Sequence, residues 1–518
     1  MQQNKVGEPK LFKLFGHFSL ALLIGVSSVN AQSFENFKRS QAESFQQYKD
    51  ERDSAFSKHL KQQWKAYSVH IGESRYEKPK PTIVPSTPQT KIKSVGPKVN
   101  INVKKLKNIE PKDSDSIILS KKVITKPLIV VSQEKDDSIN KIKIVETIKK
   151  VKPATITPKD IKFDFFGSKL GFDIPAKIKS ANFYPQNQKG ITSFFSRVAS
   201  SEYDELIKNI DEVSDAMNLN DWGRYLLVLK VSSEVYRNSD NSKLLSWFIF
   251  NKLGYAVKVG LSNKHVILMH YSKKTIYSTP NYSFSNRKFY VLSHYAKGNL
   301  GRIFSYKQDY PGSTKALDLS LNTLPFLESD MRDKTLSFKE YGKTYEVSYQ
   351  YNQNLIDFME TYPQADYETF FNAPIDSRTY KSIATALKKY LDGKKAGDAM
   401  NFVLHFVQKS FKYSKDNAQF NREKVMFAQE TLYFDRSDCE DRAVLFSYLI
   451  KELFSISVYG VHYKGHMATA LYVPMKGDYI RLGGKKLVIA DPTYINSNIG
   501  QSMSQYRTQK PKNIISVK

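Results

Sequence analysis

The chain has 518 residues and a formal net charge of +28. Its hydrophobic content of 41% and aromatic content of 13% exclude a wholly disordered chain, and its length allows two to four domains. No long apolar run follows the N-terminal one, which excludes a protein with several membrane spans. The single cysteine, Cys439, excludes an intramolecular disulfide, a zinc site built on several thiolates and a CxxC redox motif.

Residues 1–31 are typical of a secretory signal peptide. Lys5, Lys10 and Lys13 precede an apolar stretch at 14–26, and small residues follow it. This stretch is shorter than the ~20 residues that a spanning helix needs, so we expect cleavage after Ala31. The alternative is an uncleaved single-span anchor. Both interpretations place the bulk of the chain outside the cytoplasm, in the periplasm or secreted, and cleavage would leave no integral membrane domain.

The segment 32–77 is predicted to contain one long amphipathic helix at 33–67. Its large apolar side chains recur at helical spacing: Phe34, Phe37, Phe45, Tyr48, Phe56, Leu60 and Trp64. We favour a helix docked on the rest of the protein or a short coiled coil. The alternative is a helix that binds an envelope partner or a membrane surface, although its mixed charges argue against a purely basic membrane binder.

The segment 78–160 differs in composition from the rest of the chain. Between residues 78 and 159 there are 19 lysines against 7 acidic residues, 9 of the 20 prolines and no aromatic residue. Because such a stretch has little to bury, we predict a disordered basic linker. Much of the positive charge lies here and lacks interleaved aromatic residues, so nucleic acid is not expected as a partner. Anionic envelope polymers or lipid headgroups are the expected partners.

The remainder is predicted to be globular. Residues 161–283 mix helix and strand patterns, 284–376 are predicted to form a β-rich domain, and 377–518 return to helical spacing before a final motif-rich part. The period-two alternation at 335–338 and 344–349 predicts strands there.

Cys439 lies at the predicted start of a buried helix. Asp438 is a natural N-cap, and Asp441 lies three residues further on, as the acid of a capping box would. Exposed amides and the helix dipole favour a thiolate at such a position, which makes Cys439 a candidate nucleophile. Asp441 and its neighbour Glu440 are expected to serve capping and local ion pairing rather than chemistry.

A thiolate needs a general acid/base, and the imidazole that provides it needs an orienting group. His466 opens a predicted strand after a glycine, and Asp491 ends the next apolar strand at 487–490. The order is therefore Cys on a helix, His on a strand and Asp on a following strand, with spacings of about 27 and 25 residues.

These three motifs resemble those of the transglutaminase-like superfamily of papain-like thiol enzymes. They are Cys439-Glu440-Asp441, Gly465-His466 and Asp491-Pro492-Thr493, preceded by Ala428-Gln429-Glu430-Thr431-Leu432. The resemblance covers about residues 380–500. It departs from the pattern at Ser437, where family members often have glycine.

The resemblance implies an α+β fold with a papain-like, transglutaminase-like catalytic domain at 377–518. Cys439 would be the nucleophile, His466 the general acid/base and Asp491 its orienting group, acting on an amide through a thioester. The Cys439 N–H would help to hold the oxyanion, with Gln429 or Tyr433 as guesses for a second donor. No metal or cofactor is expected.

Residues 161–283 contain a candidate degenerate copy of this domain. The alignment places Ser239 on Cys439, His265 on His466 and Thr279-Pro280 on Asp491-Pro492. The C-terminal copy would hold 24 extra residues before its cysteine. A coincidence between two ordinary helix–strand stretches is the alternative.

Three functions remain open at this point. The favoured one is a secreted or periplasmic cysteine hydrolase of peptide or isopeptide bonds, with a protein or peptide as substrate. The first alternative is a transferase that joins a protein glutamine to an amine. The second is a non-catalytic envelope scaffold.

Overall fold

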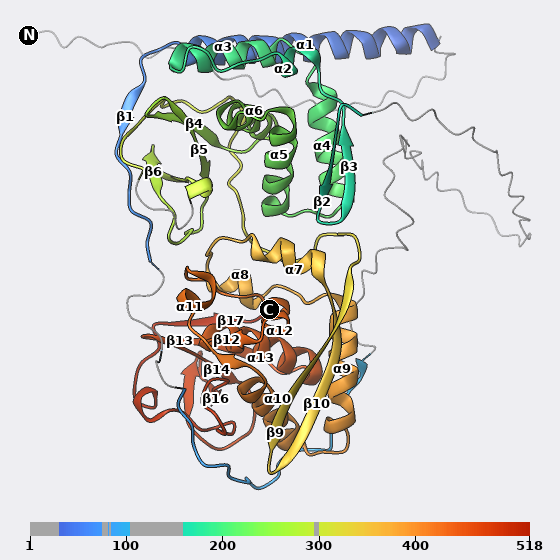
Figure 1. Ribbon diagram of the computed structural model, residues 1–518, viewed down its shortest axis with the longest axis vertical. Coiled ribbons are helices and arrows are strands. Elements are labelled where there is room, and N and C mark those ends of the chain that lie inside the picture. The colour runs from blue at the N-terminus through green and yellow to red at the C-terminus, as the bar shows by residue number, and fades with distance from the viewer. Residues whose placement is uncertain (1–30, 75–80, 82–83, 104–158, 295–299) are drawn as a thin grey trace, which may run out of the picture. The chain divides into compact units, whose positions relative to one another are not determined.

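The computed structural model describes residues 31–74, 81, 84–103, 159–294 and 300–518, and shows a mixed α/β chain (Figure 1). Of the predicted signal peptide, only its last residue, Ala31, is among them; the rest of that prediction lies outside the described residues. The chain forms two compact units, residues 1–53 and 54–518, which are treated separately below.

The predicted amphipathic helix is α1 (Ala31–Leu60), whose first part belongs to the first unit. There Phe37, Phe45 and Tyr48 are exposed to solvent. The second part belongs to the second unit, where Phe56 and Leu60 are buried. Among the described residues, no helix combines the length and apolar character needed to cross a bilayer.

The predicted helix end at residue 67 was wrong. The indole N–H of Trp64 donates to the Leu60 carbonyl at 3.1 Å, after the helix has ended. Residues Lys65–Tyr67 instead form strand β1, which pairs antiparallel with β8 (Ile303–Ser305). Strand pairing at a sheet edge therefore overrides the helical spacing of this short stretch.

The second unit contains a six-stranded sheet, here called the N-terminal sheet, in the order β1-β8-β4-β5-β7-β6. Its other strands are β4 (Val257–Ser262), β5 (His265–Tyr271), β6 (Asn281–Phe284) and β7 (Arg287–Tyr290). Helix α6 (Ser239–Lys252) packs on β4 and β5 and against α5 (Asp221–Val235). The elements from β1 to β8 are here called the N-terminal part, and those from β9 onward the C-terminal part. The other elements of the N-terminal part are β2 (Ile161–Phe165), β3 (Ser168–Phe172), α2 (Ala176–Lys179), α3 (Gln188–Ala199), α4 (Asp204–Ala216) and η2 (Leu292–His294).

The same unit contains a five-stranded C-terminal sheet in the order β15-β16-β14-β13-β17. Its strands are β13 (Val458–Tyr463), β14 (His466–Leu471), β15 (Tyr479–Leu482), β16 (Lys485–Ala490) and β17 (Asn513–Ser516). Helix α13 (Cys439–Phe454) packs on β13 and β14 and against α10 (Ala396–Ser410). The neighbouring elements are α7 (Gln353–Glu360), α8 (Tyr367–Phe371), α9 (Ser377–Leu391), β11 (Lys412–Tyr413), α11 (Asp416–Phe420), α12 (Ala428–Tyr433), β12 (Arg436–Ser437) and η3 (Ser504–Tyr506).

The two sheets share one strand order. Reading the N-terminal sheet as β6-β7-β5-β4-β8 matches β15-β16-β14-β13-β17 strand for strand. The β4–β5 and β13–β14 hairpins also share their register, since Ser262 pairs with His265 as Tyr463 pairs with His466. The alignment of Thr279 with Asp491 was wrong, because Thr279 precedes β6, whereas Asp491 follows β16, the counterpart of β7.

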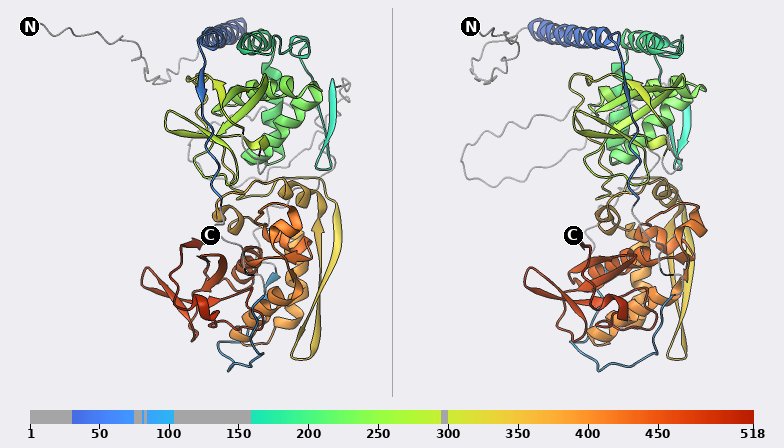
Figure 2. Two further views of the ribbon diagram at one scale, coloured as in Figure 1. Left: turned by 60° about the vertical axis from the view of Figure 1, so that its left-hand side comes forward. Right: turned by 90° about the vertical axis from the view of Figure 1, so that its left-hand side faces the viewer.

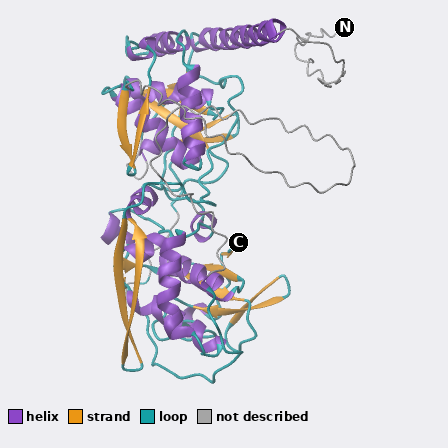
Figure 3. Cartoon of the chain, turned by 90° about the vertical axis from the view of Figure 1, so that its right-hand side faces the viewer, coloured by secondary structure: helices purple, strands orange, loops and turns teal. Residues whose placement is uncertain are grey.

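The region 284–376 is not set apart as a β-rich domain. Its first strands, β7 and β8, belong to the N-terminal sheet. The predicted alternating segments lie in a long hairpin of β9 (Met331–Glu340) and β10 (Lys343–Asn352), which packs against α9 and α10 (Figure 3). The strand prediction is confirmed, but the hairpin buries its apolar face on the helices of the C-terminal part.

Part of the predicted disordered linker is bound in the structure. Residues 84–103, here called the bound segment, run beside elements of the C-terminal part (Figure 2). The Thr87 N–H donates to the Ile495 carbonyl at 3.0 Å, and the Val99 N–H donates to the Lys394 carbonyl at 2.9 Å. Ile101 is buried in the core, and its N–H donates to Asp392. The linker prediction was therefore wrong for 84–103, and 78–80, 82–83 and 104–158 lie outside the described residues.

Ile101→Ala should lower the free energy of unfolding by about 2 kcal/mol or more, because it removes a buried aliphatic side chain and leaves a cavity. Urea unfolding of the full chain measures this change. The matched control is Ile92→Ala, which alters an exposed residue of the same segment and should change stability by less than ~0.5 kcal/mol. Equal, small effects of both substitutions would show that the segment is unbound in solution.

Candidate active site

Three elements bring the predicted site residues toward one end of the strands β14 and β16 of the C-terminal sheet. Cys439 is the first residue of α13, His466 the first residue of β14, and Asp491 directly follows β16. Figure 1 labels these three elements. Since β14 and β16 pair antiparallel, with Thr469 opposite Ala490, the start of one strand lies beside the end of the other. Gly465, in the turn before His466, has φ +75°, a conformation that favours glycine.

His466 and Asp491 form a buried pair. The His466 Nε2 and Asp491 Oδ2 atoms are 2.8 Å apart, and both side chains are at most 3% exposed. The second carboxylate oxygen, Oδ1, accepts the N–H groups of Thr493 and Tyr494 at 3.0 and 3.2 Å. The Asp491 carboxylate is thereby fixed at both oxygens, and it in turn fixes the rotation of the imidazole.

The backbone of Asp491 is held by helix α10. The Gln408 Nε2 donates to the Asp491 carbonyl at 3.0 Å and to the Ser497 carbonyl at 3.1 Å. His405 also contacts the Ser497 carbonyl, and its other ring nitrogen lies 2.8 Å from Glu340. His405 therefore has a structural position.

The other ring nitrogen of His466 is Nδ1, which Asp491 does not contact. Nδ1 is buried and has no hydrogen-bond partner among the described residues. One face of the ring stacks on Tyr506, with centroids 4.7 Å apart and planes 20° apart. Tyr506 also packs against Tyr463, so two tyrosine rings follow one another on this side of the imidazole. Nδ1 is therefore the ring nitrogen that the pair with Asp491 leaves unbonded.

Cys439 is 2% exposed and begins α13. Its Sγ–H donates to Glu440 Oε2 at 3.0 Å, and Glu440 is fully buried. Burial raises the pKa of Tyr506, its side-chain hydrogen bond with Gln505 opposes this shift, and negative charge at Cys439 or Asp491 raises the pKa further. Tyr506 thus stacks on the imidazole and lies within electrostatic range of the thiol and the carboxylate.

The start of α13 is capped as the sequence predicted. The Asp438 N–H donates to Asp441 Oδ2 at 3.0 Å, and the Met426 N–H donates to Asp441 Oδ1 at 2.9 Å. Asp441 thus orders the turn that carries Cys439 and joins it to the preceding segment.

Arg442 is a fully buried cation one turn into α13. It donates to Ser437 Oγ and to the carbonyls of Gln408 and Phe411, at 2.8 to 3.1 Å. Burial lowers the pKa of Arg442 to about 10, while nearby anionic groups, including Asp438, oppose this shift. Arg442 is still cationic at neutral pH and connects the helix of Cys439 to Gln408, which holds Asp491.

Buried acids surround the helix start. Oxygens of Asp416, Asp438 and Asp441 lie within 4.8 Å of one another, close enough for one cation to bridge. Asp416 accepts the Lys424 N–H at 2.9 Å, and Asp441 accepts two backbone N–H groups as described. These bonds give the acids a role in ordering the backbone around Cys439.

The two guesses for an oxyanion donor have structural contacts. Gln429 Oε1 accepts the Asp376 N–H at the start of α9 at 2.8 Å. The ring of Tyr433 packs against Tyr351 and Phe434. Both residues lie on α12, which packs against α13.

Sequence reasoning missed the contact of Glu440 with the thiol and the positions of Gln408, Arg442 and Tyr506. The adjacency of Glu440 and Cys439 was the one signal available. Tyr506 lies 40 residues beyond His466, in a stretch without a recognisable pattern. Comparison with protein-family profiles, characterised proteins and solved structures finds no match to this chain.

Arg442→Met should lower the free energy of unfolding by about 3–5 kcal/mol, because it leaves buried carbonyls and nearby acids without their cation. Urea unfolding is the measurement. Arg436→Met alters an exposed arginine three residues before Cys439 and should change stability by less than ~0.5 kcal/mol. A loss below ~1 kcal/mol for Arg442→Met would contradict a tightly bound buried cation.

Glu440→Gln should raise the rate at which iodoacetamide alkylates Cys439 at pH 7, by about ten-fold. A carboxylate beside the thiol disfavours the thiolate, and a neutral amide removes that repulsion. Because Cys439 is the only cysteine, mass spectrometry of the intact chain counts this one reaction. Glu452→Gln, later on the same helix, is the control. An unchanged rate for Glu440→Gln would mean that its carboxylate does not face the thiol in solution.

Proposed function

We propose that the C-terminal part is a transglutaminase-like cysteine hydrolase that cleaves peptide or isopeptide bonds. The observation that carries this proposal is the His466–Asp491 pair at 2.8 Å, whose second imidazole nitrogen is buried without a partner among the described residues. The only thiol of the chain begins the helix that packs on the same strand. A thiol enzyme needs these parts: a nucleophilic sulfur, an imidazole that exchanges its proton, and a carboxylate that orients the imidazole.

In the first step, the Cys439 thiol transfers its proton to His466, and the sulfur attacks the amide carbonyl carbon. The helix start favours the thiolate, and the backbone N–H of Cys439 is the first donor for the developing oxyanion. The imidazolium then donates its proton to the amide nitrogen as the C–N bond breaks. An amine leaves, and a thioester remains on Cys439.

In the second step, His466 accepts a proton from water, and the resulting hydroxide attacks the thioester carbonyl. The C–S bond breaks, the acid product leaves, and the sulfur regains a proton from the imidazolium. Asp491 holds the imidazole in one orientation throughout both steps.

The arrangement of elements supports a papain-like core. Helix α13 is followed by an antiparallel sheet in which β14 carries His466 and β16 leads to Asp491. The shared strand order and hairpin register support the N-terminal sheet as a degenerate copy of this core. In that copy Ser239 replaces the cysteine, and His265, which is largely exposed, pairs with Asp240 at 3.0 Å.

The same proposal includes a secreted or periplasmic location and a protein or peptide substrate. It also includes envelope contacts through α1 and the lysine-rich residues 78–159. They are supported by the signal-like N-terminus, the lysine-rich composition of 78–159 and the exposed aromatic side chains Phe37, Phe45 and Tyr48.

A non-catalytic envelope scaffold is the second candidate. One observation favours it: the thiol is 2% exposed and donates to Glu440 instead of to His466. A thiol held in this way reacts slowly. The two candidates therefore differ in the reactivity of Cys439 and in the effect of its replacement.

Cys439→Ala, His466→Gln and Asp491→Asn should each lower the rate of peptide cleavage by about 10³-fold or more, since each removes a member of one catalytic unit. The substrates are a library of peptides and isopeptide-linked peptides, with cleavage followed by mass spectrometry. His462→Gln is the matched control: it replaces a nearby histidine that packs against Tyr367, and it should retain activity.

Iodoacetamide labelling separates the two candidates. In the hydrolase, wild-type Cys439 reacts near pH 7, and His466→Gln slows this reaction. Envelope binding that is unchanged in Cys439→Ala, together with an unreactive wild-type thiol, would support the scaffold. Incorporation of a labelled amine into glutamine peptides by wild type, but not by Cys439→Ala, would identify a transferase.

A further inference from the structure

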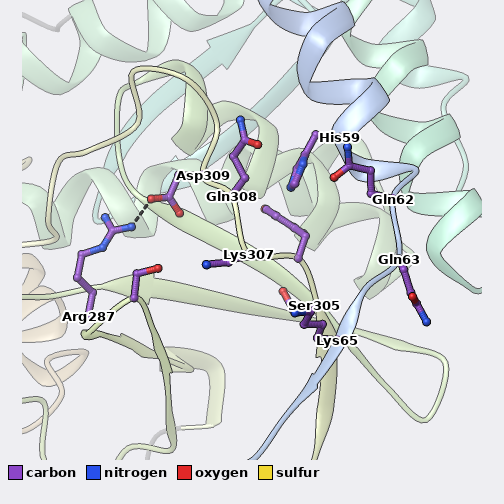
Figure 4. Close-up of a pocket in the computed structure, with 11 residues that line it drawn as sticks. His59, Gln62, Gln63, Lys65, Arg287, Ser305, Lys307, Gln308 and Asp309 are labelled. Carbon is purple, nitrogen blue, oxygen red and sulfur yellow. Dashed lines mark hydrogen bonds and ion pairs between the residues drawn. The ribbon is translucent and has the colours of Figure 1, made fainter. Parts of the chain in front are cut away.

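A cavity lies in the part of the chain that carries the N-terminal sheet, at the end of helix α1. It has a volume of about 460 Å³ and is formed by three segments that are distant in sequence (Figure 4). They are the end of α1 with the residues up to β1, the β6–β7 turn, and the end of β8 with the residues after it. A cavity of this size holds a small organic molecule.

Almost every side chain at this cavity is polar. Gln62, Gln63 and Gln308 offer amides, and Ser285 offers a hydroxyl, whereas the Ser305 hydroxyl already donates to the Val259 carbonyl at 2.7 Å. Such groups orient a polar ligand by hydrogen bonds. Tyr306 is the one large aromatic residue of the lining.

The charge of the lining is positive. The lining contains three cationic side chains and one carboxylate, which leaves an excess of two positive charges. The cations are Lys65, Arg287 and Lys307, and the carboxylate is Asp309. Asp309 is already paired with Arg287, as Figure 4 shows, and with Lys258, whose Nζ lies 2.7 Å away. The carboxylate is thus neutralised within the protein, whereas Lys65 and Lys307 are exposed.

A buried lysine holds one of the loops that form the cavity. Lys258 is fully buried and donates to the carbonyls of Lys307 and Gln308 at 2.9 and 3.3 Å, which fixes the loop that carries both side chains. His59 lines the opposite side, and its Nε2 is buried without a hydrogen-bond partner among the described residues. Burial lowers the pKa of His59, a side-chain hydrogen bond with Gln62 opposes this shift, and Lys258 lowers the pKa further, so the net shift favours the neutral ring.

We propose that this cavity binds a small organic phosphate. Lys65 and Lys307 bind the phosphate group, and the glutamine side chains and Ser285 bind the rest of the ligand. A phosphate monoester carries nearly two negative charges near neutral pH, which matches the excess charge of the lining better than a single carboxylate does. The site lies in the N-terminal part and uses none of the residues assigned to the thiol site.

Isothermal titration of the full chain with glucose 6-phosphate tests the proposal. We expect saturable binding of one equivalent, and binding at least ten-fold weaker for glucuronate, which offers a sugar with a carboxylate. Lys65→Ala and Lys307→Ala should each weaken the binding of glucose 6-phosphate about ten-fold, since each removes a charge-assisted hydrogen bond. Both lysines are exposed, so both variants should fold.

Lys162→Ala is the matched control, because it removes an exposed lysine of β2 outside the cavity and should leave binding unchanged. Cys439→Ala should also bind as wild type does, so a failure of the proposed hydrolase leaves this result intact. If Lys65→Ala and Lys307→Ala bind like the control, the anion is held elsewhere, as by the basic segment 78–159, and the proposal fails. Equal binding of glucuronate would overturn the assignment to phosphate.

Discussion

The antiparallel pairing of β14 with β16 is the constraint on which the candidate active site depends. It places the first residue of one strand, His466, beside the residue that follows the other, Asp491, and their side chains meet at 2.8 Å. Neither side chain could remain buried alone at low cost, because a buried carboxylate or imidazole needs a hydrogen-bonding partner. A slip of β14 by one residue against β16 would turn His466 to the other face of the sheet and separate it from Asp491.

The buried cation Arg442 connects the loop after β16 to the helix that begins with Cys439. Arg442 donates to the Gln408 carbonyl, and the Gln408 amide donates to the Asp491 carbonyl. The helix that begins with Cys439 and the loop that carries Asp491 are therefore held by the same two residues. Such a network is worth most when all of its members are satisfied, so the loss of one member should loosen both sides of the site.

The two sheets carry different histidine–carboxylate pairs on the same arrangement of strands. In the C-terminal sheet, the histidine at the start of the second hairpin strand is buried and bound to Asp491. In the N-terminal sheet, the corresponding His265 is exposed and pairs with Asp240 on the helix. A buried imidazole with a fixed partner can exchange protons with a nucleophile in a controlled way, whereas an exposed pair is open to water. The shared topology therefore does not by itself decide the function.

The sequence by itself determined the features that depend on neighbouring residues: the cap of Asp438 and Asp441, the strand that His466 opens, and the alternating strands of the β9–β10 hairpin. Local spacing, capping and turn chemistry specify such elements. Only the tertiary structure decided that Tyr506 stacks on His466, that Gln408 holds the Asp491 loop, and that 84–103 are bound. These contacts join segments 40 to about 400 residues apart in sequence, and the packing that forms them leaves no periodic signal in any one segment.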